Sequence, residues 1–122
     1  MSTYRPAPAS EVPLVNLSRW RVKKITSSLK RLGTAIVLVG TDEATGDGRV
    51  SSQVKKFDPK TRQAITSTGR VYQLVGPSGM TLDAAYVFGV WCKKWRVTAD
   101  VDITARYEKK ARKPKAGRKQ AA

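Results

Sequence analysis

Hydrophobic and polar residues alternate most regularly near the end of the chain. Apolar residues occupy every second position there: Val97, Ala99, Val101, Ile103, Ala105 and Tyr107. Strict alternation is typical of a strand with one buried face and one solvated face. The pattern therefore predicts one continuous strand over residues 97–107.

A helical period precedes that strand. Its positions are spaced i, i+3, i+4, i+7 and i+8, and they are Leu82, Ala85, Tyr86, Gly89 and Val90. This spacing predicts the core-facing stripe of an amphipathic helix. Thr81 is a suitable N-cap residue, and Asp83 in the first turn favours the positive end of the helix dipole. We expect a helix over about 81–95.

The middle of the chain contains short apolar segments separated by turn residues. Residues 34–40 form an apolar run between Gly33 and Gly40, which predicts a central strand buried on both faces. Residues 41–48 are acidic and glycine-containing, and predict a loop. Residues 49–75 predict a three-stranded antiparallel meander, with turns at 58–61 and 68–69.

Residues 17–32 have two periodicities. Val22, Ile25 and Leu29 have helical spacing, whereas Trp20 and Val22 alternate with charged residues as in a strand. Both interpretations stay open at this stage. The β-branched content of the first part favours a strand over about 18–26, followed by a turn over 27–33.

Together these elements predict a mainly β (α+β) protein with about six strands and one helix. Short connections indicate antiparallel pairing, in a small curved sheet or an SH3-like or OB-like barrel. The single globular domain should span 16–108. It should follow a flexible Pro- and Ala-rich arm over 1–15 and precede a disordered basic tail over 109–122.

Composition narrows the classes of function. The chain has 122 residues, 24 Lys and Arg, 9 Asp and Glu, a net charge of +15, one Cys and no His. A lone Cys92 excludes an internal disulfide framework. Without His, zinc-finger and zinc-hydrolase sites are excluded, as are Ser-His and Cys-His nucleophiles. We therefore expect a protein that is not an enzyme, with no metal and no cofactor.

The basic residues are segregated along the chain. The tail contributes Lys109, Lys110, Arg112, Lys113, Lys115, Arg118 and Lys119. Residues 1–108 still hold 17 basic and 9 acidic residues, a net charge of +8. A second basic run comprises Arg19, Arg21, Lys23, Lys24, Lys30 and Arg31. Polyanion binding is one explanation of such runs, and an ordinary solvated surface is the other.

Further candidates lie on the expected meander and beside the tryptophans. The meander carries Lys55, Lys56, Lys60, Arg62 and Arg70. Trp20 lies between two arginines, and Trp91 and Trp95 flank Lys93 and Lys94. Indole rings beside cations suit single-stranded nucleic acid, because bases stack on aromatic rings. Core packing is the simpler explanation of each Trp, and the stripe Phe88, Trp91 and Trp95 also suits a protein contact.

Acidic pairs raise one weaker possibility. Asp100 and Asp102 should share a strand face, and Asp42, Glu43 and Asp47 share one loop. Nucleases hold Mg²⁺ with such carboxylates, but a third acid of matching spacing is missing from the sequence. Solvent-facing acids are the better interpretation.

The leading hypothesis is a non-enzymatic, cytoplasmic, nucleic-acid-binding protein with mainly backbone-led and shape-led contacts. DNA, RNA and the ribosome are all open as targets. The alternative is a protein-interaction module, such as an accessory or inhibitor protein of a phage or plasmid. It would bind an acidic partner or pair with itself through the aromatic helix stripe. We expect no membrane partner, because no apolar run is long enough to span a bilayer.

Overall fold

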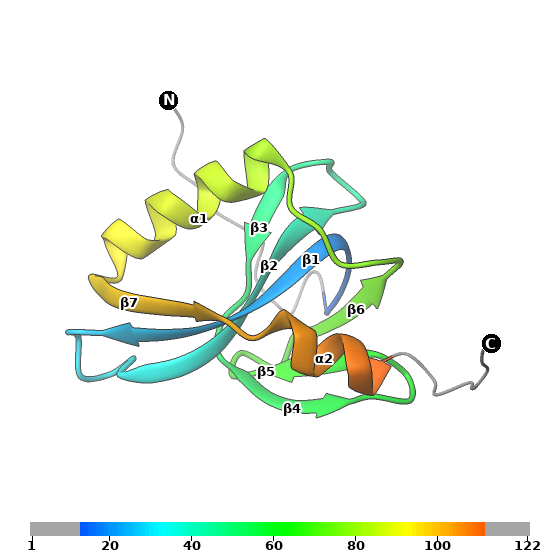
Figure 1. Ribbon diagram of the computed structural model, residues 1–122, viewed down its shortest axis with the longest axis horizontal. Helices are drawn as coiled ribbons and strands as arrows, with labels where there is room; N and C mark the ends of the chain where they lie inside the picture. Colours follow the sequence, from blue (N-terminus) through cyan, green and yellow to red (C-terminus); the bar gives the residue numbers. More distant parts are fainter. Residues whose placement is uncertain (1–12, 112–122) are drawn as a thin grey trace.

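The computed structural model describes residues 13–111, with side chains described as far as Glu108. Residues 1–12 of the arm predicted over 1–15 lie outside the described residues, as do the tail residues Arg112, Lys113, Lys115, Arg118 and Lys119. Seven strands and two helices follow in the order β1 Leu14–Ser27, β2 Thr34–Asp42, β3 Gly48–Val50, β4 Val54–Asp58, β5 Gln63–Thr66, β6 Val71–Val75, α1 Leu82–Lys94, β7 Val97–Asp102 and α2 Thr104–Ala111 (Figure 1). The protein is mainly β, as predicted.

Strand β1 organises the sheet because it pairs with three other strands. Its first part, Leu14–Ser18, runs parallel to β6, and its last part, Lys23–Ser27, runs antiparallel to β7. Strand β2 pairs antiparallel along both parts. A bulge between Ser18 and Arg21, with Arg19 at φ 46°, separates the two parts. Bulges bend a strand and increase its twist, which lets β1 change partners.

The prediction of wholly antiparallel pairing is wrong at β1 and β6. Four strands lie between them in the chain, so the connection is long enough for a parallel pair. The prediction of a strand over 18–26 and a turn over 27–33 is confirmed, although β1 begins earlier, at Leu14.

The sheet is curved but does not close into a barrel. Its main path of strands is β3-β2-β1-β6-β5-β4, with β7 beside β1 as a further edge off this path, so β3 and β4 are the two end strands of the path and do not pair. Only residues 51–53 connect these two edges. So short a link brings the two edges close together at that end. The predicted meander is correct for β4, β5 and β6, but β3 pairs with β2 instead.

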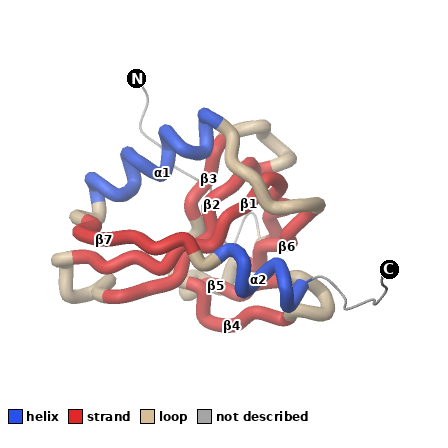
Figure 2. The backbone as a smooth tube through the Cα atoms, in the orientation of Figure 1, coloured by secondary structure: helices blue, strands red, loops and turns tan. Residues whose placement is uncertain are grey.

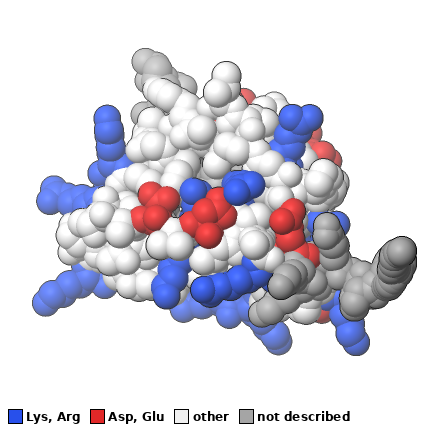
Figure 3. All heavy atoms as spheres, in the orientation of Figure 1, with Lys and Arg blue, Asp and Glu red and all other residues white. Residues whose placement is uncertain are grey.

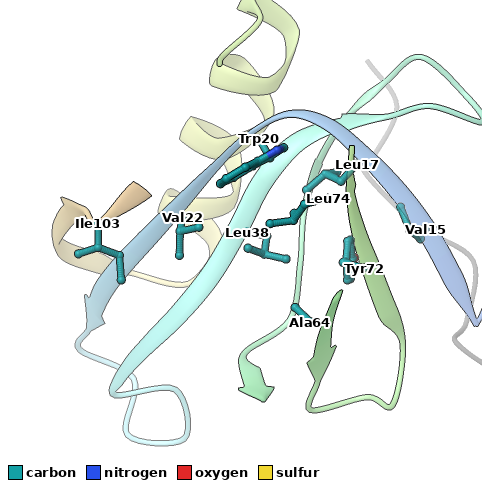
Figure 4. Close-up of a cluster of buried hydrophobic side chains, with 9 residues drawn as sticks. All are labelled: Val15, Leu17, Trp20, Val22, Leu38, Ala64, Tyr72, Leu74 and Ile103. Carbon is teal, nitrogen blue, oxygen red and sulfur yellow. The ribbon is translucent and has the colours of Figure 1, made fainter. Parts of the chain in front are cut away.

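One hydrophobic core lies on the concave side of the sheet. Side chains from β1 and β2 point toward those from β5 and β6 (Figure 4). Trp20 is fully buried there, and its indole Nε1 donates to the carbonyl of Gly76 at 3.1 Å. Ile103, which precedes α2, closes one end of this cluster.

A second core lies beneath α1, which covers the other face of β2 (Figures 1 and 2). The two faces of β2 supply different cores, as predicted for a strand buried on both faces: Val37 faces α1 and Leu38 faces the first core. Ala84 packs so closely on Gly48 that a Cβ added to Gly48 would lie 2.6 Å from the Ala84 Cα. A larger residue than glycine would force the helix away.

The predicted helix is confirmed, and Thr81 caps it by accepting a hydrogen bond from the Ala84 N–H at 3.1 Å. The predicted core stripe is wrong. Leu82 is 92% exposed and Tyr86 61% exposed, whereas Ala84, Val87, Phe88 and Trp91 face the sheet. The stripe that contains Phe88 and Trp91 has larger rings to bury than the predicted stripe, so it determines which side of the helix faces the sheet.

The predicted strand over 97–107 ends early. β7 stops at Asp102, whose carboxylate accepts a hydrogen bond from the Thr104 N–H at 2.9 Å. The Thr104 hydroxyl in turn accepts from the Val22 N–H at 2.9 Å. These bonds turn the chain into α2, whose sequence is rich in helix-forming Ala, Arg, Glu and Lys. Helix α2 also includes the first residues of the predicted tail, up to Ala111.

Within residues 13–111, neither helix is long and apolar enough to cross a membrane.

Candidate functional site

A pocket of about 570 Å³ lies beside α1, at the end of the sheet where residues 51–53 connect the two edges. This size is typical of small-molecule sites. Four parts of the chain line it, namely the β1–β2 turn, the 51–53 link, the β5–β6 turn with its neighbours, and α1. The lining residues are Arg31, Leu32, Val50, Ser51, Ser52, Gln53, Ser67, Thr68, Arg70, Tyr72, Val87, Val90, Trp91, Lys94 and Trp95.

One wall of the pocket is aromatic. Trp91 lies in the last turn of α1 and Trp95 is its C-cap residue, and their ring centroids are 6.2 Å apart. Trp91 stacks on Phe88 at 6.1 Å with an interplanar angle of 16°, which ties the wall to the second core. Both tryptophans are half-buried rather than enclosed. Their rings therefore pack on the fold and still reach the cavity.

A second wall, formed by the 51–53 link and the β5–β6 turn, is rich in hydroxyl groups. Ser51 is held in place, because its hydroxyl accepts from the Leu38 N–H at 2.9 Å and donates to the Ser52 carbonyl at 2.7 Å. The Ser52 and Thr68 hydroxyl oxygens lie 3.4 Å apart. The Ser67 N–H donates to the Gln53 carbonyl at 2.8 Å, which joins the link to the β5–β6 turn. This wall can donate and accept hydrogen bonds in several directions.

Three cationic side chains complete the pocket, from three separate parts of the chain. They are Arg31, Arg70 and Lys94, and none of the described lining residues is acidic. The Arg31 guanidinium lies 5.4 Å from the ring centroid of Trp95, within the range of a cation–π contact. Arg31 and Lys94 are exposed at the rim, whereas Arg70 is buried. The pocket thus combines positive charge, stacking surfaces and hydroxyl groups.

Two other predicted basic residues lie on the opposite side of α1, at the β1–β7 edge, and pair with acids. Arg21 Nε lies 2.8 Å from Asp102 Oδ2. Lys23 Nζ lies 3.5 Å from Asp100 and 3.7 Å from Asp102, and 5.4 Å from the centroid of the Phe88 ring. Burial acts to raise the pKa of Asp102, but hydrogen bonds from Thr104 and Arg21 outweigh it and lower that pKa.

The space-filling view shows the same arrangement. Acidic side chains gather near the middle of the face that carries β7 and α2, and Lys and Arg project around its margins (Figure 3). The acid pair Asp100 and Asp102 therefore neutralises cations. Nowhere in residues 13–111 do three or more His, Cys, Asp or Glu side chains gather as metal ligands would.

Two further candidates serve the fold. Trp20 is in the first core, which confirms the packing interpretation for this residue. Arg62 lies over its ring at 5.8 Å and donates to the same Gly76 carbonyl at 2.7 Å. Both contacts hold Arg62 against the loop after β6.

The other predicted basic residues are distributed widely over the surface. Arg19, Lys24, Lys30, Lys55, Lys56 and Lys60 are exposed. Lys30 adjoins Arg31 in the β1–β2 turn, while Lys55, Lys56 and Lys60 lie on and beyond β4. Lys109 and Lys110 belong to α2, but their side chains are outside the described part of the chain. Of the predicted cations whose side chains the structure describes, it brings only Arg31 and Arg70 to the pocket.

Sequence reasoning named Lys94 only as a cation between two tryptophans, and it missed the hydroxyl wall. The sequence does contain a signal, because Ser51-Ser52-Gln53 and Ser67-Thr68-Gly69 are polar segments at strand ends. Their meeting depends on the curvature of the sheet, which no local pattern encodes.

Cys92 lies on α1 but not among the lining residues. Burial raises its pKa to about 11, and the charge of Asp100 adds to this while Lys23 opposes it. Such a thiol is a poor nucleophile at neutral pH.

Compared with protein-family models, with curated proteins and with solved structures, this chain matches none of them. The pocket is interpreted below from its own chemistry.

Proposed function

We propose that this protein binds nucleic acid without catalysing a reaction, and that the pocket beside α1 is the centre of the binding surface. The observation that supports this most directly is the set of lining residues, with the exposed cations Arg31 and Lys94, two tryptophans and no acid among those described. Phosphate contacts would come from Lys and Arg, with little reading of base edges. The single Cys suits the reducing cytoplasm, where we propose that the protein acts.

The net charge of +15 supports the same proposal. Phosphate binding releases condensed counterions, so the logarithm of the binding constant should fall linearly with the logarithm of salt concentration. The expected slope is about −0.9 per phosphate neutralised on duplex DNA, and about −0.7 on single strands.

The test uses the full chain with fluorescently labelled single-stranded DNA, duplex DNA and RNA of equal length. Anisotropy titrations from ~50 to ~300 mM salt should give a straight line with negative slope for at least one of them. Failure of all three probes to bind at ~50 mM salt would contradict the proposal.

The outward face of α1 favours a second function, self-association. Leu82 and Tyr86 are 92% and 61% exposed on this face. The predicted interface stripe Phe88, Trp91 and Trp95 faces the sheet and pocket, so the outward stripe is the one free to pair. Exposed apolar stripes of this kind often mark protein contacts.

Charge on the same helix suits a second copy of the chain as the partner. Asp83 lies in the first turn of α1 and Lys93 in the last. Two α1 helices packed antiparallel would place Asp83 of each copy near Lys93 of the other. Sedimentation velocity should then show a dimer that Tyr86→Glu dissociates, and a monomer at all concentrations would contradict this function.

A further inference from the structure

We infer that the pocket beside α1 takes one unstacked base of a single-stranded nucleic acid, together with an adjoining phosphate. This inference rests on the proposed function and specifies the form of nucleic acid. The base would stack on Trp95, the hydroxyl wall would contact its edge, and Arg31 and Lys94 would hold the phosphate.

The aromatic wall supports stacking. The Arg31 guanidinium is a planar group that already lies over the Trp95 ring at 5.4 Å. Arginine planes and nucleobases use the same aromatic surfaces in proteins that bind single strands. Arg31 is exposed and comes from a turn, so its side chain can move aside to a phosphate when a base takes its place.

The hydroxyl wall supports recognition of a polar flat ligand over an aliphatic one. Ser52, Ser67 and Thr68 line the same pocket as Trp91 and Trp95. A base presents both donors and acceptors along its edge, and a hydroxyl group can pair with either. Such a wall therefore tolerates different bases, which fits binding with little sequence preference.

Duplex DNA suits the pocket less well than a single strand. The bases of a duplex are stacked and paired, so a base would enter only after unstacking, which costs a few kcal/mol. A single strand offers its bases at much lower cost. A volume of about 570 Å³ is also enough for a nucleotide unit but not for a base pair with its two backbones.

The test compares matched variants of the full chain, with an unlabelled oligothymidylate of about ten nucleotides as the probe. Lys94→Gln removes a pocket cation, and Lys93→Gln removes the neighbouring cation of the same helical turn, which does not line the pocket. Trp95→Leu removes the stacking surface, whereas Trp95→Phe keeps an aromatic ring at the same position and is its matched control.

Binding of the oligothymidylate to wild type should quench tryptophan fluorescence. Trp95→Leu should weaken binding between about 5-fold and about 150-fold, and Trp95→Phe should weaken it less because a stacking ring remains. Lys94→Gln should flatten the salt slope by about 0.7, with a smaller change for Lys93→Gln. If Trp95→Leu does not fold, Lys94→Gln and the wild-type quenching decide the matter, because the Lys94 side chain is exposed.

The outcomes separate the two levels of the proposal. Salt-dependent binding without quenching, and with equal effects of Lys94→Gln and Lys93→Gln, would overturn the pocket inference and leave nucleic-acid binding in place. Absence of oligothymidylate binding at ~50 mM salt would overturn the pocket inference, and it would overturn the proposed function as well only if the duplex DNA and RNA probes also fail to bind. Thymidine monophosphate binding as tightly as the oligonucleotide would make the ligand a free nucleotide and overturn the single-strand assignment.

Discussion

Two groups of cations on opposite sides of α1 differ in their partners. At the β1–β7 edge, Arg21 and Lys23 face Asp100 and Asp102. At the pocket, Arg31 lies over the Trp95 ring, and no acid is among the described lining residues. The same residue types are neutralised in one place and left to attract anions in the other.

The difference shows that a count of basic residues does not locate a binding surface. Arg21 and Arg31 belong to the same acid-free stretch of sequence. A sheet register brings Lys23 opposite Asp102, which lies far away in the chain. Charge that is paired within the fold contributes little to counterion release, because the phosphate would have to displace the carboxylate.

The largest expected effect is on binding at the pocket. Arg31→Gln combined with Lys94→Gln should weaken nucleic-acid binding at least about tenfold, because each bond to a charged group is worth about 1.5–3 kcal/mol. Lys24→Gln combined with Lys60→Gln removes the same charge from exposed positions elsewhere and is the matched control. Equal losses in anisotropy titrations would mean that total charge matters and the pocket does not.

The next effect is on stability at the edge. Asp102→Ala removes the acceptor of the Thr104 N–H, which begins α2, and the partner of Arg21. The loss of a helix cap and of a partly exposed ion pair should cost about 1–2 kcal/mol in the free energy of unfolding. Urea denaturation measures this cost. Asp100→Ala loses only the Lys23 pair, so a cost as large as that of Asp102→Ala would contradict the capping role.

Removing the carboxylates of Asp100 and Asp102 should leave the cations of the β1–β7 edge able to attract phosphate, as those of the pocket do. Asp100→Asn combined with Asp102→Asn leaves Arg21 and Lys23 without carboxylates. Nucleic-acid affinity should rise a few-fold, roughly, and the salt slope should steepen by about 0.7 for each cation that gains a phosphate. An unchanged slope would show that the edge lies outside the path of the nucleic acid.

The pH dependence of the folding stability should also report the ionisation of Asp102. Asp102 has a lowered pKa in the folded protein, so its ionised form stabilises the fold above the unfolded pKa of about 3.9. That contribution is lost as the pH falls through the folded pKa. Denaturation midpoints from pH 5 to pH 2.5, roughly, should therefore converge for wild type and Asp102→Asn as the pH falls. A constant difference over this range would contradict the assignment.

The smallest effect is on Cys92, which lies near the edge charges. Its pKa of about 11 should make alkylation by iodoacetamide at about pH 8 far slower than that of free cysteine. Asp100→Asn removes one cause of the raised pKa and should increase the rate slightly, whereas burial keeps it slow. A slower alkylation of Cys92 in this variant, followed by mass spectrometry, would contradict the expected effect of Asp100 on the thiol.

Local sequence pattern was sufficient to predict an element when residues within that same segment determine its start or its burial. Thr81 and Asp83 mark the start of α1, and the apolar run in β2 indicates burial on both faces. The β-rich class followed from such segments. Local pattern was insufficient at Ile103, because alternation continues through α2 while the hydrogen bonds of Asp102 and Thr104 turn the chain.

The candidate site was likewise predictable only in part from the sequence. Trp91, Trp95 and Arg31 could be selected from the sequence as aromatic and basic residues, but Arg62 and Arg21 were selected on the same grounds and lie in structural contacts. Residue type limits the chemistry that a side chain can perform. It does not show whether that side chain is already bound to a carboxylate or a carbonyl group within the fold.

The sequence alone determined a basic, β-rich chain with one capped amphipathic helix and no His-based chemistry. The tertiary structure decided which stripe of α1 faces the sheet, because both stripes are apolar and only packing against Gly48 and β2 selects between them. It also decided which cations face acids, since β1 and β7 pair across long sequence separation. Finally, the curved, unclosed sheet brought residues 51–53, the β5–β6 turn and α1 together around one pocket.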